Sequence, residues 1–115
     1  MFVQSLDESP QNHRGGGQTS YLMLGPGQFG SENLIVAWLE GEPGSRQDLH
    51  AHPSSEQVYV IVRGRGLMTI EDETREVSSG MLVYIPAGSR HAIEAVGDQQ
   101  LMLVSALSPP VPSTS

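Results

Sequence analysis

The sequence contains no cysteine, no lysine and few aromatic side chains, which make up 5% of its 115 residues. Without cysteine the chain cannot form disulfides, thiolate metal sites or a cysteine nucleophile. With 37% hydrophobic residues and so few aromatics, its core is predicted to be small and mainly aliphatic. A single domain of about this length buries only roughly two-thirds of its unfolded surface. Burial against a second copy would add stability, and we expect a homodimer.

Basic side chains are also scarce, because six arginines stand against 13 acidic residues, for a formal net charge of -7. Such a chain repels phosphate backbones, so we expect no nucleic-acid partner. No segment approaches the roughly 18 consecutive apolar residues of a membrane helix, so no membrane partner is expected. Met1 to Leu6 carry no positive side chain and are followed by Asp7 and Glu8, unlike a secretion signal. These absences favour a cytoplasmic location.

The two ends of the chain differ in composition from its middle. Residues 1–18 lack apolar periodicity and include Gly15-Gly16-Gly17, which predicts a flexible N-terminal arm. Residues 108–115 contain three prolines, which cannot donate to a sheet ladder, so we expect a Pro/Ser-rich C-terminal tail. The folded domain is then predicted over residues 19–107.

Within that domain, short segments rich in Val, Ile and Leu alternate with turns rich in glycine, proline and acidic residues. Neither helical periodicity nor a helical crossover is evident, which favours an all-β antiparallel sandwich or barrel. We predict seven strands, at Tyr21–Leu24, Asn33–Leu39, Gln57–Arg63, Leu67–Glu71, Leu82–Ile85, Ala92–Val96 and Leu101–Ala106.

Three of the four histidines fall in the predicted domain, at His50, His52 and His91. If their segment is extended, His50 and His52 point to the same face, and two such imidazoles can bind one metal ion at about 2.0–2.1 Å. Alone this pair is a weak signal. The surrounding pattern is more specific: Gly44-x5-His50-x-His52-x4-Gln57-x6-Gly64 is followed by Gly80-x5-Pro86-x-Gly88-x2-His91.

These two patterns resemble the consecutive motifs of the cupin superfamily, in particular its small single-domain, cupin 2-type members. The resemblance covers residues 44–95 by motif. It implies an antiparallel double-stranded β-helix, the jelly-roll or cupin barrel. It also implies one bound divalent metal ion, with His50 and His52 supplied by the first motif, His91 by the second, and a fourth acidic or amide ligand by the first.

Two adjacent residues compete for that fourth position, Glu56 and Gln57. Side-chain alternation along a strand separates them, because Gln57 shares a face with Tyr59 and Ile61 whereas Glu56 shares a face with valines. We interpret the valine face as packing between layers and the mixed face as a wall of the barrel interior. This interpretation favours Gln57 as the ligand and leaves Glu56 as a carboxylate at the rim or hydrogen-bonded to a ligand.

The fourth ligand sets the charge of the site. Three neutral imidazoles and a carboxylate leave a divalent ion at +1, whereas an amide leaves it at +2 and makes it a stronger Lewis acid. Nitrogen and oxygen ligands suit Mn, Fe, Ni, Cu or Zn. We therefore predict a metal-dependent enzyme acting on a small oxygenated substrate such as a sugar or keto acid. The reaction is either Lewis-acid isomerisation, elimination or decarboxylation, or it is dioxygenation. The alternative is a non-catalytic small-molecule-binding or sensing module.

Three further side chains are candidates for contact with the substrate. Glu56 and Tyr59 are candidates for proton transfer, and Tyr59 can also donate a hydrogen bond to a substrate oxygen. Arg90, the neighbour of His91 in the sequence, is a candidate for pairing with a substrate carboxylate.

Overall fold

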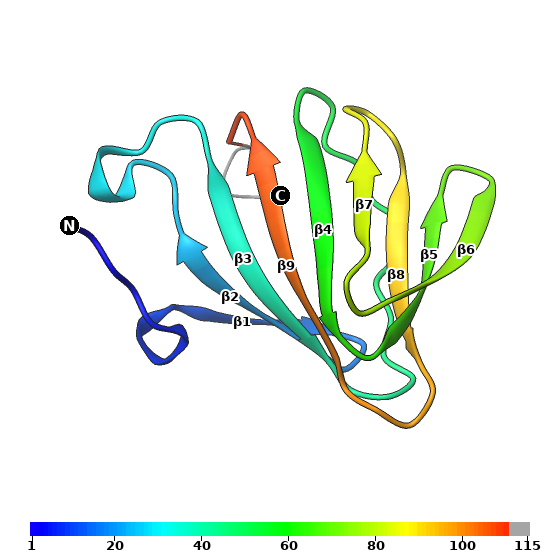
Figure 1. Cartoon of the computed structure of the whole chain (residues 1–115). Coiled ribbons are helices and arrows are strands. Elements are labelled where there is room, and N and C mark those ends of the chain that lie inside the picture. The colour runs from blue at the N-terminus through cyan, green and yellow to red at the C-terminus, as the bar shows by residue number, and fades with distance from the viewer. Residues whose placement is uncertain (111–115) are drawn as a thin grey trace.

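The protein is built from two antiparallel β-sheets that face each other, as the computed structural model shows for residues 1–110 (Figure 1). One sheet has six strands in the order β1-β2-β3-β9-β4-β7, and the other has three in the order β6-β5-β8. The strands are β1 (Gln11–Gly15), β2 (Gln18–Leu24), β3 (Ile35–Gly41), β4 (Glu56–Arg63), β5 (Arg65–Ile70), β6 (Glu73–Ser78), β7 (Leu82–Ile85), β8 (His91–Val96) and β9 (Leu101–Ser108), and short 3-10 turns lie at Leu6–Glu8 and Gln28–Gly30.

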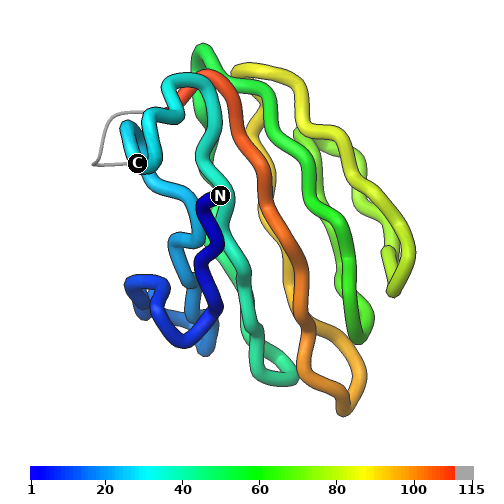
Figure 2. Tube along the Cα trace, turned by 60° about the vertical axis from the view of Figure 1, so that its left-hand side comes forward, coloured from blue at the N-terminus to red at the C-terminus, as the bar shows by residue number. Residues whose placement is uncertain are grey.

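From β4 onward the chain crosses repeatedly between the two sheets. It passes from β4 to the β5–β6 hairpin, then to β7, β8 and β9, so that neighbouring strands come from distant parts of the sequence (Figures 1 and 2). This path is that of a jelly-roll barrel, and it confirms the predicted fold class. Each of the seven predicted strands coincides with an observed one. No helix within residues 1–110 is long and apolar enough to cross a membrane.

Two strands were not predicted, and both are polar edge strands. All five residues of β1 are exposed, and four of the six residues of β6 are exposed and polar or charged, so neither strand shows apolar alternation. Because β1 pairs with β2 and the 3-10 turn precedes it, residues 1–18 are not the flexible arm that we expected. At the other end β9 continues to Ser108, and residues 111–115 of the predicted tail lie outside the described residues.

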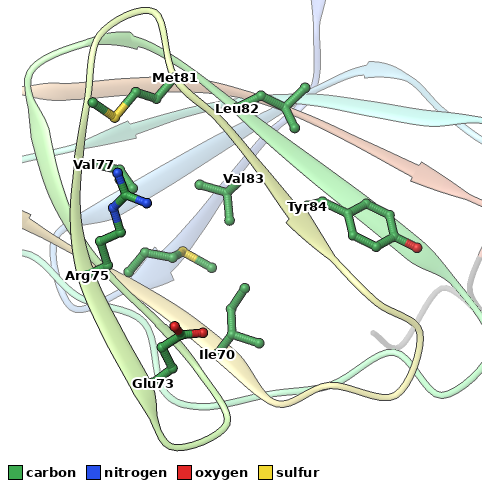
Figure 3. Close-up of a pocket in the computed structure, with 9 residues that line it drawn as sticks. Ile70, Glu73, Arg75, Val77, Met81, Leu82, Val83 and Tyr84 are labelled. Carbon is green, nitrogen blue, oxygen red and sulfur yellow. The ribbon is translucent and has the colours of Figure 1, made fainter.

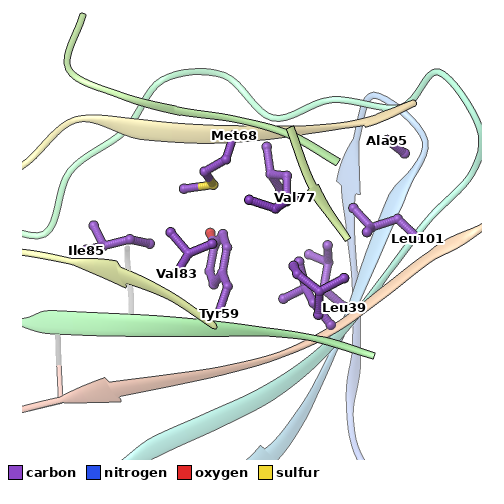
Figure 4. Packing of buried hydrophobic residues seen from close by; sticks show 11 residues of the cluster. Leu39, Tyr59, Met68, Val77, Val83, Ile85, Ala95 and Leu101 are labelled. Carbon is purple, nitrogen blue, oxygen red and sulfur yellow. The ribbon is translucent and has the colours of Figure 1, made fainter. Parts of the chain in front are cut away.

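The hydrophobic core lies between the two sheets (Figure 4). It is mainly aliphatic, as the composition predicts, with one tyrosine and one methionine. Burying each large aliphatic side chain contributes about 1.5–3 kcal/mol. The buried members are Leu39, Tyr59, Ile61, Met68, Val77, Val83, Ile85, Ile93, Ala95, Leu101 and Leu103.

Alternation along β4 decides which side chains enter this interior. Gln57, Tyr59 and Ile61 are buried, whereas Val60 and Val62 are exposed on the outer surface. The mixed face therefore lines the interior, as we interpreted it. The interpretation of the valine face as packing between layers is wrong for the single chain, because that face points away from the second sheet.

Candidate metal centre

Three histidines from two distant segments meet at the start of β8. The main chains of His50 and His91 form a reciprocal bridge, with N–H to O distances of 3.1 and 2.9 Å. This bridge holds the segment that contains His50 and His52 against β8, so one ligand atom of each of the three rings lies within 4.8 Å of the others. Imidazole nitrogens this close can coordinate one ion. The structure thus brings together the three predicted histidines.

The turn between β7 and β8 fixes the second contact of the His52 segment. Gly88 has φ +82, a left-handed conformation that glycine adopts without strain. In this conformation the Gly88 N–H donates to the carbonyl of His52 over 2.9 Å, and the N–H of Ser89 donates to the carbonyl of Pro86 over 3.1 Å. The turn therefore carries the chain into β8 and anchors His52 at the same time.

Main-chain carbonyls orient two of the imidazole rings. The Nδ1 of His50 lies 3.0 Å from the carbonyl of Asp48, and the Nδ1 of His91 lies 2.9 Å from the carbonyl of Ser89. A carbonyl accepts only, so in each ring Nδ1 carries the proton and Nε2 keeps its lone pair free for a metal. The Nε2 of His91 is buried and has no hydrogen-bond partner among the described residues.

Burial also keeps these rings in the metal-binding form. His91 is 0% exposed, and burial lowers its pKa to about 4. Burial lowers the pKa of His52 as well, with a further contribution from the positive charge of His50 when that ring is protonated. Both rings are therefore neutral near neutral pH, and only the neutral imidazole can donate its lone pair.

Gln57 presents an unpaired oxygen to the same interior. Its Nε2 donates to the hydroxyl of Ser105 on β9 over 2.8 Å, which fixes the orientation of the amide. Its Oε1 is buried without a partner among the described residues. An unpaired buried acceptor costs about 1–3 kcal/mol, so this orientation is unfavourable unless something binds the oxygen.

Most of the unpaired buried polar atoms belong to predicted ligands. Within the described residues five buried side-chain nitrogens or oxygens have no partner, and three of them are His52 Nδ1, Gln57 Oε1 and His91 Nε2. Buried polar groups normally have partners. Imidazole nitrogens and an amide oxygen are a donor set suited to a divalent ion. The residues present therefore fit the expected metal.

Of the remaining candidates, only Tyr59 enters the interior. It is 3% exposed, and its ring centre lies 6.1 Å from that of His91. Its hydroxyl makes a long contact of 3.5 Å with Gln47 Oε1. Burial raises the pKa of Tyr59 above its usual value of 10, which keeps the hydroxyl protonated.

Glu56 and Arg90 do not face the histidines, contrary to the roles predicted for them. Glu56 is exposed on the outer side of β4 and accepts a hydrogen bond of 2.8 Å from the hydroxyl of Tyr84. Arg90 is exposed and pairs with Glu71, at 3.1 Å between Nη2 and Oε2. The physical reason for Glu56 is strand alternation, which sends it to the side opposite Gln57. Arg90 instead ties the turn before β8 to the β5–β6 hairpin.

Two residues that contact the site escaped the sequence analysis. Ser105 orients Gln57, and its signal was present, since it is a polar residue inside the otherwise apolar run Leu101–Leu107. Gln47 accepts the main-chain N–H of Ile93 at 3.1 Å as well as the contact from Tyr59. It lies in an irregular segment, and no spacing rule distinguishes it.

The protein is a small antiparallel jelly-roll barrel with three histidines close together in its interior. These two features place it in a class of candidate metal-binding proteins. This chain belongs to the cupin family, because the family model described as the cupin domain matches residues 37–107. That match spans both histidine motifs and the strands that carry them.

Two curated relatives show the range of this similarity. An uncharacterized protein of Methanocaldococcus jannaschii is 43% identical over 67 residues, 58% of this chain and 54% of that relative, so the chain spans about half of its length. The polyketide synthase CurC of Streptomyces cyaneus is 31% identical over 113 residues, 98% of this chain and 73% of that relative.

Solved structures share the fold at low sequence identity. A protein described as a predicted oxalate decarboxylase from Thermotoga maritima has a TM-score of 0.84 at 21% identity, covering 95% of this chain and 100% of that one. The polyketide cyclase RemF from Streptomyces resistomycificus has a TM-score of 0.81 at 18% identity, covering 97% of this chain and 82% of that one. These likenesses show the cupin fold.

Proposed function

We propose that this protein is a metal-dependent enzyme that holds one divalent ion through His50, His52, His91 and Gln57 and catalyses isomerisation or elimination on a carbonyl compound. The observation that carries the proposal is that His52, Gln57 and His91 each have a buried side-chain nitrogen or oxygen without a hydrogen-bond partner among the described residues. A purely structural polar cluster would pair these atoms with one another or with the main chain.

The neutral ligand set favours Lewis-acid chemistry. When bound, a divalent ion supplies polarisation of a carbonyl oxygen and stabilises negative charge that develops on it. Three neutral imidazoles and a neutral amide leave the full +2 charge available for this purpose. The burial that keeps His91 neutral also excludes water, and a low local dielectric strengthens such electrostatic stabilisation.

Tyr59 is proposed as the proton donor. It is buried, its ring lies beside His91, and its raised pKa keeps its proton on the hydroxyl. A protonated tyrosine donates a hydrogen bond or a proton to a substrate oxygen but is a poor base at neutral pH. Since Glu56 faces away, Tyr59 alone of the two predicted proton-transfer residues is retained in this role.

The relatives support a substrate that carries carbonyl or carboxylate oxygens. They include a polyketide synthase protein, a polyketide cyclase and a protein described as a predicted oxalate decarboxylase. Polyketides and oxalate share oxygens that a divalent ion binds. We therefore propose a keto compound as the substrate class, ahead of a sugar.

The test is solvent exchange at the carbon next to a carbonyl, measured by proton NMR in D₂O. Protein loaded with Mn, Zn or Ni is incubated with 2-oxo acids, 1,3-diketones and a hexose, and loss of the C–H signal reports enolisation. We expect exchange that needs the metal, that disappears in His91→Ala and that survives in His13→Ala, since His13 is an exposed residue of β1.

Two other results would replace this proposal. Substrate-dependent loss of O₂ with a redox-active metal would assign a dioxygenase. Tight binding of a small molecule with neither exchange nor O₂ uptake would assign the non-catalytic binding module.

A further inference from the structure

A cavity of about 420 Å³ opens between the edge strands of the two sheets, β6 and β7 (Figure 3). We call it the β6–β7 pocket. Its wall is mostly apolar, and the residues used below are Met68, Ile70, Glu73, Arg75, Met81 and Val83. Cavities of this size hold drug-sized molecules.

Strand register places this pocket beside the candidate metal centre. On the inner face of the small sheet, His91 of β8 is opposite Ile70 of β5, which is opposite Glu73 of β6. On the large sheet, Val83 of β7 is opposite Tyr59 of β4. Two residues of the pocket wall, Ile70 and Val83, are therefore direct cross-strand neighbours of His91 and Tyr59.

The same register sets the distance from His91 to β6. Neighbouring strands lie about 4.8 Å apart, so two strand spacings separate β8 from β6 by roughly 10 Å. A molecule that extends from the histidines to β6 is therefore longer than a simple keto acid. It needs two or three fused rings or an extended chain.

Arg75 supplies a positive charge to the pocket on β6. Arg75 is on the inner face of β6, in the row of Met68, and Figure 3 shows its side chain beside the pocket with Glu73 below it. Within the described residues the two ion pairs join Arg65 to Glu76 and Arg90 to Glu71, so Arg75 has no carboxylate partner there.

We propose that the β6–β7 pocket binds the body of an elongated, mainly apolar substrate with an anionic group that pairs with Arg75 and an opposite end that reaches the histidines. The reactive end of this substrate rests on the proposed function, whereas the pocket and its anion preference do not. Arginine suits such a group because its planar fork of donors matches a carboxylate.

The test uses 2-naphthoate and the uncharged 2-naphthamide as probes, followed by the methyl signals of ¹³C-methionine. Met68 and Met81 line the pocket, while Met23 and Met102 lie elsewhere, on β2 and on β9. We expect naphthoate to shift the Met68 and Met81 signals and to leave those of Met23 and Met102 in place. No shift at the two pocket methionines would overturn the proposal.

Charge variants test the anion preference. Arg75→Gln should weaken naphthoate binding about tenfold, the loss expected for one charge-assisted hydrogen bond, and leave naphthamide unchanged. Glu73→Gln should tighten naphthoate binding because it removes a negative charge from the same face. Arg63→Gln is the matched control, an exposed arginine on β4 outside the pocket. Equal naphthoate affinity in Arg75→Gln and wild type would show that Arg75 only protects an edge strand from pairing with other chains.

A Mn²⁺-loaded sample separates this proposal from the proposed function. The ring protons of naphthoate far from its carboxylate should broaden most, because that end faces the histidines. The reverse order would overturn the proposed orientation. Binding in the pocket is measured with and without metal. Pocket binding without solvent exchange on any keto compound would refute the proposed enzyme function but support the proposed pocket. Solvent exchange without pocket binding would support the enzyme function and refute the pocket proposal.

Discussion

Replacement of Gln57 by leucine separates the role of the amide in the fold from its role in metal binding. In the metal-free protein the change removes the hydrogen bond to Ser105, which is 2.8 Å long and contributes about 1 kcal/mol. It also removes the unpaired Oε1, whose burial costs about 1–3 kcal/mol. We therefore expect the metal-free Gln57→Leu protein to be as stable as wild type or up to about 2 kcal/mol more stable.

In the metal-bound protein the same change has the opposite effect. Loss of a residue that merely hydrogen-bonds a metal ligand weakens binding by about 10–100-fold, so loss of a ligand should weaken it by about 100-fold or more. At a metal concentration of about 1,000 times the wild-type Kd, binding stabilises wild type by about 4.1 kcal/mol. The variant is then at about 10 times its own Kd and gains only about 1.4 kcal/mol.

The assay is urea unfolding with and without Zn²⁺, followed through the fluorescence of Trp38, the one tryptophan of the chain, together with calorimetric titration of the metal. Glu56→Gln is the matched control, because Glu56 is the neighbouring residue of the same strand and faces outward. Wild-type metal affinity in Gln57→Leu, or weakened affinity in Glu56→Gln, would refute the assignment of Gln57 as the fourth ligand.

Three further predictions concern residues around the histidines. Tyr59→Phe should bind metal as wild type does but lose exchange activity by about 100-fold or more, the usual scale of general acid catalysis. Because burial raises the pKa of Tyr59 above its usual value of 10, wild-type activity should persist to at least that pH. Equal activity in both proteins would exclude Tyr59 as the proton donor. Gly88→Ala should lower the free energy of unfolding by about 1 kcal/mol or more, because Gly88 has a φ of +82. It should also weaken metal binding, because the hydrogen bond from Gly88 to the carbonyl of His52 is disturbed. Denaturation and metal titration measure the two effects, and an unchanged metal affinity would mean that the turn does not position His52. Arg90→Ala should lower the free energy of unfolding by less than about 1 kcal/mol, as for other exposed ion pairs, and should leave metal affinity unchanged in the same titration. A large loss of metal affinity would mean that the pairing of Arg90 with Glu71 holds the metal centre in place.

Much of the barrel follows from local rules. Alternating apolar residues bounded by glycine and proline turns locate the seven strands that bury side chains, because each of these strands must present one face to a core. The edge strands β1 and β6 have no such constraint, and their residues are mostly exposed and polar, so the same rule cannot detect them.

The candidate site likewise contains residues that the sequence identifies and residues that it does not. Spacing identifies His50, His52 and His91, since a turn and an extended segment place each of them at a defined point of the chain. Spacing does not identify Ser105, which reaches Gln57 only because β9 pairs with β4 across 48 residues of sequence.

What the sequence determined by itself is which side chains share a face, because the period of a strand is two residues whatever surrounds it. It thereby separated Gln57 and Tyr59 from Glu56 and the valines. Only the tertiary structure decided what each face meets, because that depends on where the second sheet packs. The packing of that sheet buried the mixed face of β4, with Gln57 and Tyr59, and left the valine face exposed.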